Sequence, residues 1–126
     1  MLKVNDQLRP EPTPFAGIAH ATLACAADGI HQLSVWRQVL DAGTATPPHS
    51  HECDEVVFCV SGRGEVHAEG MTRHFGAQSS VVLPKGLVHQ LFNVGPMPLE
   101  LIGIFGSTPV TTHLPDGQAI DLPWPS

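Results

Sequence analysis

The chain has 126 residues, carries a formal net charge of −6, and is 42% hydrophobic but only 14% charged. This composition predicts one folded domain with a hydrophobic core and excludes an intrinsically disordered chain. The six Lys and Arg residues are scattered singly, which argues against a nucleic-acid partner, and no apolar run reaches the roughly 18 residues of a membrane-spanning helix.

The start of the chain and its cysteines both favour the cytoplasm. The first three residues lead into polar, proline-rich sequence rather than into the apolar core of a signal peptide. The cysteines, Cys25, Cys53 and Cys59, are odd in number and form no Cys-x-x-Cys pair, so free thiols are expected rather than a disulfide framework. Cys53 lies between His51 and Glu55, so a metal-ligand role for it stays open, although a free thiol is favoured.

The elements are expected in the following order along the chain. Residues 1–14 contain three prolines and predict an extended N-terminal arm. Short β-branched or apolar runs follow between turn signals, at residues 31–40, 55–60, 64–70, 79–83, 88–94 and 99–105. The first run comes nearest to an amphipathic helix, but its Val35, Trp36 and Val39 favour a strand. This rhythm predicts an all-β sandwich or barrel over residues 15–113 and an irregular C-terminal tail over residues 114–126.

A polar cluster stands where the run at 55–60 begins. Residues i and i+2 of a strand point to the same face, so His49 and His51 are expected on one side, with Glu55 on the same parity. Burying these groups is unfavourable unless they are paired or bound to a metal. Neutral imidazoles and an ionised carboxylate are natural ligands of transition metals, and His89 at the start of a later apolar run is a fourth candidate.

Together the two segments resemble the two-motif signature of the cupin superfamily, and the rest of the chain fits a small single-domain member. The first motif is Gly, five residues, His-x-His, three residues, Glu, six residues, Gly. It is matched by Gly43, His49, His51, Glu55 and Gly62. The second motif is matched by Pro84, Gly86, His89 and Asn93. One departure is Gln78, which stands six positions before Pro84, where the family usually has Gly.

This resemblance implies a cupin jelly-roll β-barrel whose mouth binds one divalent transition metal per chain. The implied ligands are His49, His51, Glu55 and His89, with positions left open for water or substrate. The donor set suits Fe, Mn, Ni, Co, Cu or Zn. The leading expectation is a mononuclear non-haem metal dioxygenase that acts on a small, largely apolar or aromatic oxygen-chelating molecule. The alternatives are a non-enzymatic ligand-binding or sensor cupin and a metal-dependent isomerase or lyase.

The absence of tyrosine narrows the chemistry. The chain contains no Tyr, which argues against cupin enzymes that use a Tyr as general acid or base. A general acid or base is then expected from Glu55, from His67 or from a metal-bound hydroxide. Val57, Cys59 and Leu91 share the parity of the ligands and are expected to form apolar walls, with Trp36 and Phe105 as further candidates.

The opposite faces of the same strands are also apolar. They carry Val56, Phe58, Val60, Gln90, Phe92 and Val94. Such a surface needs cover from the second sheet or from another subunit, and a homodimer is predicted. The other expected partner is a small-molecule substrate or ligand, with neither nucleic acid nor a membrane.

Overall fold

A computed structural model describes residues 1–6 and 8–126, and regular structure within them is almost entirely β. One short 3₁₀ helix, η1, covers Ala26–Asp28. The strands are β1 Glu11–Pro12, β2 Ile18–Ala24, β3 Ser34–Leu40, β4 Ser50–His51, β5 Glu55–Ser61, β6 Arg63–Ala68, β7 Met71–Gly76, β8 Ser80–Leu83, β9 His89–Asn93, β10 Leu99–Phe105, β11 Thr112–His113 and β12 Ala119–Ile120. The all-β prediction is therefore confirmed.

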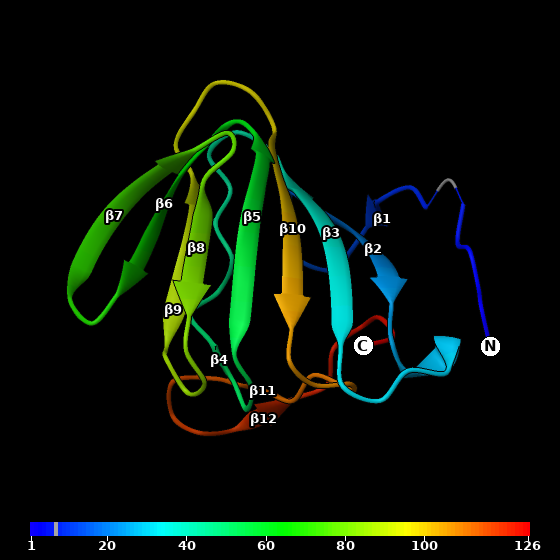
Figure 1. The fold of residues 1–126 in the computed structure, drawn as a ribbon. Coiled ribbons are helices and arrows are strands. Elements are labelled where there is room, and N and C mark those ends of the chain that lie inside the picture. The colour runs from blue at the N-terminus through cyan, green and yellow to red at the C-terminus, as the bar shows by residue number, and fades with distance from the viewer. Residues whose placement is uncertain (7) are drawn as a thin grey trace.

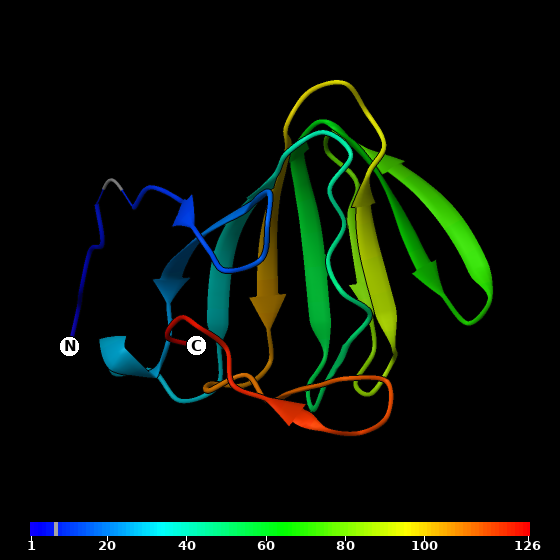
Figure 2. The ribbon, with the colours of Figure 1, turned by 180° about the vertical axis from the view of Figure 1, so that it is seen from behind.

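The strands form one large and two small antiparallel sheets. The large sheet has the order β1-β2-β3-β10-β5-β8, and the small sheets have the orders β7-β6-β9 and β12-β11-β4. The large sheet forms one broad layer, and the β6–β7 hairpin splays away from it at one side (Figure 1). From behind, β9 and the segment that leads into β4 cross in front of the large sheet, and β12 runs beneath its lower end (Figure 2). The arrangement agrees with the expected jelly roll.

The main hydrophobic core lies between the large sheet and the β7-β6-β9 sheet. Alternate residues of the long strands point inward, as the period of two in a β-strand requires. The most buried members of this cluster, each at most 5% exposed, are Ile18, Leu40, Val57, Cys59, Leu83, Leu91, Leu99 and Leu101. Burial of one such aliphatic side chain stabilises the fold by about 1.5–3 kcal/mol. The same inward parity carries the polar cluster of the sequence into the interior.

All six expected runs contain a strand, but two longer strands lie outside them. β2 runs through Ile18–Ala24, where small and polar residues interrupt the apolar pattern. β7 lies at the end of its sheet and is mostly exposed, so burial imposes little hydrophobic alternation on it. Within the described residues, no helix combines the length and apolar character that crossing a membrane requires.

Two turns explain positions of the cupin-like motifs. Gly62 has φ of 96°, and a Cβ atom there would lie 2.8 Å from the Pro98 carbonyl oxygen, so only glycine fits without a shift. Gln78 stands where the family usually has Gly, and it adopts a left-handed φ of 71°. The departure therefore leaves the turn in place, at the cost of putting a side chain in a conformation that glycine adopts more easily.

Parts of both terminal segments contact the large sheet. The expected arm, residues 1–14, includes Gln7, which lies outside the described residues, and its β1 pairs with β2 at the sheet edge. In the C-terminal tail, Leu122 and Trp124 pack against a second buried cluster of Trp36, Cys53, Phe105 and Val110. The division at residues 1–14, 15–113 and 114–126 stays a prediction.

Candidate metal centre

The end of one strand and the starts of two others meet at one end of the core and bring the expected ligands together. His51 ends the short β4, with His49 two residues before it, while Glu55 opens β5 and His89 opens β9. Two backbone hydrogen bonds join His49 and His89, from each amide to the other's carbonyl, at 3.1 and 2.9 Å. The Gly86 amide donates to the His51 carbonyl at 2.9 Å, so the turn of the second motif holds the first motif in place.

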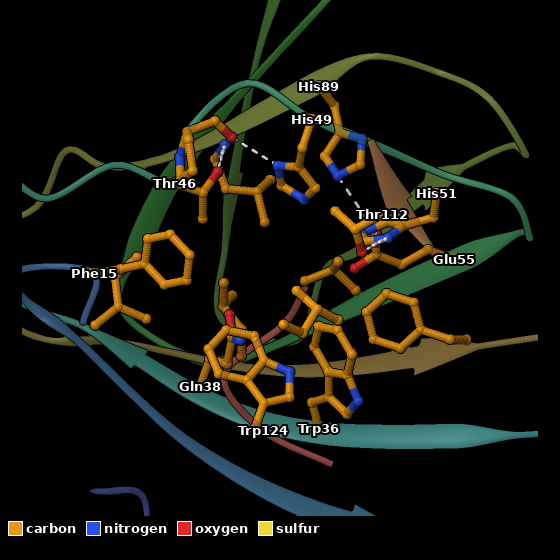
Figure 3. Close-up of a pocket in the computed structure, with 18 of the residues that line it drawn as sticks. Phe15, Trp36, Gln38, Thr46, His49, His51, Glu55, His89, Thr112 and Trp124 are labelled. Atoms are coloured by element: carbon orange, nitrogen blue, oxygen red, sulfur yellow. Dashed lines mark hydrogen bonds and ion pairs between the residues drawn. The ribbon is translucent and has the colours of Figure 1, made fainter. Parts of the chain in front are cut away.

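The three imidazoles form a compact cluster that could hold a metal ion. One ring nitrogen from each of His49, His51 and His89 lies within 4.8 Å of the others. Glu55 lies beside this cluster: its Oε1 is 3.5 Å from His51 Nε2 and 3.4 Å from His89 Nε2. Figure 3 shows the three rings and the carboxylate on one side of a cavity.

The hydrogen bonds of the imidazoles leave their Nε2 atoms free. His49 Nδ1 lies 2.6 Å from the Pro47 carbonyl and His89 Nδ1 lies 2.9 Å from the Leu87 carbonyl, so each Nδ1 carries the proton and donates it. His51 Nδ1 lies 2.9 Å from the Thr112 hydroxyl. A neutral imidazole with Nδ1 protonated bears its lone pair on Nε2, which is the tautomer that metal-binding histidines adopt in this arrangement.

Three buried polar atoms at the centre have no hydrogen-bond partner. They are His51 Nε2, Glu55 Oε1 and His89 Nε2. Leaving a buried acceptor unsatisfied is unfavourable by about 1–3 kcal/mol, so such an atom in a native core is expected to have a hydrogen-bond partner or a bound ion. A divalent cation satisfies all three at once, because imidazole nitrogen and carboxylate oxygen are its preferred donors. The residues present therefore fit a bound metal.

The electrostatics of the cluster keep two of its imidazoles neutral. Burial, reinforced by neighbouring imidazoles, lowers the pKa of His49 to about 4 and that of His51 to about 3. Burial also opposes protonation of His89, but the Glu55 carboxylate outweighs it and raises the pKa of His89 above its ordinary value. His49 and His51 are therefore available as ligands well below neutral pH.

The remaining walls of the cavity are largely apolar. Val57, Leu91, Trp36 and Phe105 line it, as the sequence predicts. Cys59 shares the parity of Val57 but is fully buried in the core below the cavity. The sequence does not predict the contribution of the C-terminal tail, whose Ile120, Leu122 and Trp124 also line the cavity. In Figure 3 the Trp124 ring lies across the cavity from His49 and His89. The one sign of this role in the sequence is the presence of two large apolar residues, Leu122 and Trp124, on either side of Pro123.

His67 does not join the site. It lies on β6 next to buried Val66, and the period of two therefore turns it to the outer face of the sheet. There its Nε2 is 3.0 Å from Glu65 Oε1 and its ring packs on Phe92 at 4.2 Å, outside the lining of the cavity. This placement gives no support to the predicted role of His67 as a general acid or base.

Two other residues singled out in the sequence have structural roles. The Asn93 side chain, at the end of β9, donates to the carbonyls of Leu40 and Met97, each at 2.9 Å. Cys53 belongs to the apolar cluster around Trp36 rather than to the histidine cluster, and burial raises the pKa of its thiol. All three cysteines are free, as expected, and the structure shows that they are also buried.

Sequence comparison places residues 36–105 in a family described as a cupin domain, a match that covers more than half of the chain. The chain is 26% identical over 113 residues to auxin-binding protein T92 of Nicotiana tabacum, an alignment that covers 80% of this chain and 60% of the relative. It is 32% identical over 111 residues to putative germin-like protein 9-2 of Oryza sativa subsp. japonica, covering 82% of this chain and 51% of that protein. The chain thus spans about half to 60% of the length of these relatives.

Solved structures show the same fold. The polyketide cyclase RemF from Streptomyces resistomycificus superposes with a TM-score of 0.74 at 18% identity, covering 97% of this chain and 87% of that one. This likeness extends over the N-terminal arm and the C-terminal tail as well as over the region matched by the family.

Proposed function

The chain belongs to the cupin family, and we propose that His49, His51, Glu55 and His89 bind one divalent transition metal in the cavity. The observation that carries this proposal is the trio of buried, unpartnered atoms at the centre of the cluster. The donor set of three imidazoles and a carboxylate suits Fe, Mn, Ni, Co, Cu and Zn rather than Mg or Ca.

We infer that the cavity takes a small, largely apolar or aromatic molecule that chelates through oxygen. Its walls are aromatic and aliphatic, and its polar groups gather at the histidine end. A ligand held there places its oxygen atoms toward the imidazoles and its apolar body against Trp36 and Phe105. These walls also exclude water from the reacting end, which strengthens every electrostatic interaction inside.

Oxygen-dependent dioxygenation is the reaction we propose first. A bound redox-active metal supplies the electron transfer between an organic molecule and O₂, and a redox-inactive one supplies Lewis-acid polarisation of a carbonyl. Among the described residues that line the cavity, the ionisable groups are the three histidines and Glu55. The four expected ligands are thus also the available proton carriers, which favours metal-centred chemistry over an isomerase or lyase with a separate acid and base. Glu55, beside two imidazoles, is positioned to take or return a proton.

A binding function is the second candidate, and the auxin-binding relatives favour it. Oxygen consumption separates the two. The iron-loaded protein is incubated with a panel of diketones and aromatic chelators in an oxygen-electrode cell, with zinc-loaded protein as the control. The dioxygenase proposal requires oxygen uptake that depends on both iron and one class of substrate. Saturable binding of a panel member without oxygen uptake, measured by calorimetry, would instead support the binding function.

We also propose that the outer face of the large sheet forms a homodimer interface. Val56 lies directly opposite Val82 on one side and Ile104 on the other, and their side chains are 36%, 70% and 39% exposed. Phe58 and Ile102 form the next row of this face. A second copy packed there would cover the apolar rows. The free thiols support a proposed location in a reducing compartment such as the cytoplasm.

A further inference from the structure

The C-terminal segment 119–126 forms part of the cavity wall. Ile120, Leu122 and Trp124 line the cavity, while the residues between them are exposed. Figure 3 shows the Trp124 ring across the cavity from His49 and His89. This segment lies beyond residues 36–105, the part of the chain that the cupin family match covers. Trp124 is therefore not one of the residues that the cupin motifs specify.

Trp124 belongs to a continuous aromatic surface that reaches the metal centre. Its ring lies 5.9 Å from Phe15 and 5.4 Å from Trp36. Trp36 in turn lies 4.1 Å from Phe105, whose ring is 5.1 Å from His51. Offset and edge-on contacts of this kind are the preferred arrangements of aromatic rings, so a flat ligand can extend the same packing across the cavity.

A directional chain of hydrogen bonds holds the tail in this position. Gln38 Nε2 lies 3.0 Å from His20 Nδ1, and because the amide nitrogen can only donate, His20 Nδ1 is the acceptor. His20 Nε2 then carries the proton and donates to the Thr22 hydroxyl at 2.8 Å. The Thr22 hydroxyl donates to the Pro125 carbonyl at 2.6 Å. His20 also stacks on Trp124, with ring centroids 4.0 Å apart and planes 15° apart.

We propose that Trp124 is a specificity-determining residue of the cavity, and that His20 and Thr22 are the positioning residues that hold it there. The ligand class is a monoanionic oxygen chelator with a flat apolar ring, whose ring packs against Trp124 while its oxygens face the histidines. The placement of the ligand oxygens at the histidine cluster rests on the proposed function. In the described part of the chain no Lys or Arg lines the cavity, so a second anionic group on the ligand would be buried without a partner.

The first experiment compares two chelators that differ only by a ring. Acetohydroxamate and benzohydroxamate present the same oxygen pair, and their affinities are measured by visible titration of cobalt-loaded protein. Trp124→Ala should weaken benzohydroxamate binding about tenfold and leave acetohydroxamate binding unchanged. Trp124→Phe should recover most of the loss, and Pro123→Ala, an exposed neighbour, is the matched control. An equal loss for both hydroxamates, or no loss for either, would overturn the assignment.

The second experiment tests the positioning residues without any metal. The chain has two tryptophans, and Trp36 is only 5% exposed, so acrylamide quenching of the fluorescence reports mainly on Trp124. Thr22→Val removes the hydroxyl and should raise the quenching constant by about a factor of two, because the tail opens more often. Thr72→Val, an exposed change on β7, is the control and should leave quenching unchanged.

The outcomes separate this inference from the proposed function. Equal quenching in Thr22→Val and in the unaltered protein overturns the positioning role, whether or not a metal binds. Increased quenching in a protein that binds no metal supports the positioning role and counts against the proposed function. Cobalt and acetohydroxamate binding with no effect of Trp124→Ala on benzohydroxamate supports the metal site and overturns the role of Trp124.

Discussion

His20 should make the stability of the fold depend on pH in a defined window. Its side chain is only 6% exposed, and burial lowers its pKa from the ordinary 6.5 to about 4. The unfolded chain therefore binds a proton at His20 between pH 6.5 and about 4, while the folded chain does not. Stability from the buried neutral imidazole is fully present above pH 6.5 and is lost as the pH falls to about 4.

The size of this effect follows from the same pKa values. At about 1.4 kcal/mol per pH unit, a fall from 6.5 to about 4 corresponds to about 3 kcal/mol of unfolding free energy. His20→Gln keeps a hydrogen-bonding side chain but removes the titrating group. The unfolding free energy of the unaltered protein minus that of His20→Gln should therefore fall by about 3 kcal/mol from pH 7 to pH 4, whatever its sign at pH 7.

Urea unfolding of the metal-free proteins at a series of pH values measures this difference. His49 and His51 also have lowered pKa values, but they titrate in both proteins and cancel in the comparison. The charged neighbours of His20 are few: Glu11 pairs with it across β1 and β2, and Arg9 lines the same surface groove. Parallel stability curves for the two proteins from pH 7 to pH 4 would refute the reasoning.

Three further predictions concern the core, a turn and the proposed dimer. Leu101→Ala removes a side chain that is 3% exposed and should lower the unfolding free energy by about 2–5 kcal/mol in urea titrations. Gly62→Ala should lower it by about 1–3 kcal/mol, because its Cβ atom would meet the Pro98 carbonyl. Gly117→Ala, also at positive φ but in open space, is its control and should lose less. Val56→Glu should convert a dimer to a monomer in light scattering. If the unaltered protein is monomeric at micromolar concentration, the proposed dimer interface is wrong.

Much of the fold and the heart of the site follow from the sequence for a simple physical reason. The spacing of His49, His51, Glu55 and His89 encodes both the strand parity and the metal-ligand chemistry, so the residues that the motif singles out do meet in space. The strand runs at 55–60 and 99–105 are equally legible, because burial on one face enforces an alternating pattern.

Other features depend on tertiary contacts that leave no local pattern. The contact of Thr112 with His51 comes from the two-residue strand β11, and the role of Trp124 in the cavity wall comes from a tail whose sequence indicates irregular structure. The outward position of His67 depends on which residues of β6 face the core, and its mixed composition does not fix that parity. β7 is not predicted from the sequence, because an exposed edge strand does not need the alternation of apolar and polar residues that identifies a strand.

The metal content of the purified protein tests the central claim most directly. Protein prepared without an affinity tag or chelator is analysed by mass spectrometry for ions per chain, alongside His51→Ala, His89→Ala and the exposed control His74→Ala. The account predicts close to one transition-metal ion per chain in the unaltered protein and the control, and a loss of most of that metal in the two ligand variants. Equal metal content in all four proteins, or a protein that neither contains nor takes up a metal, would contradict it.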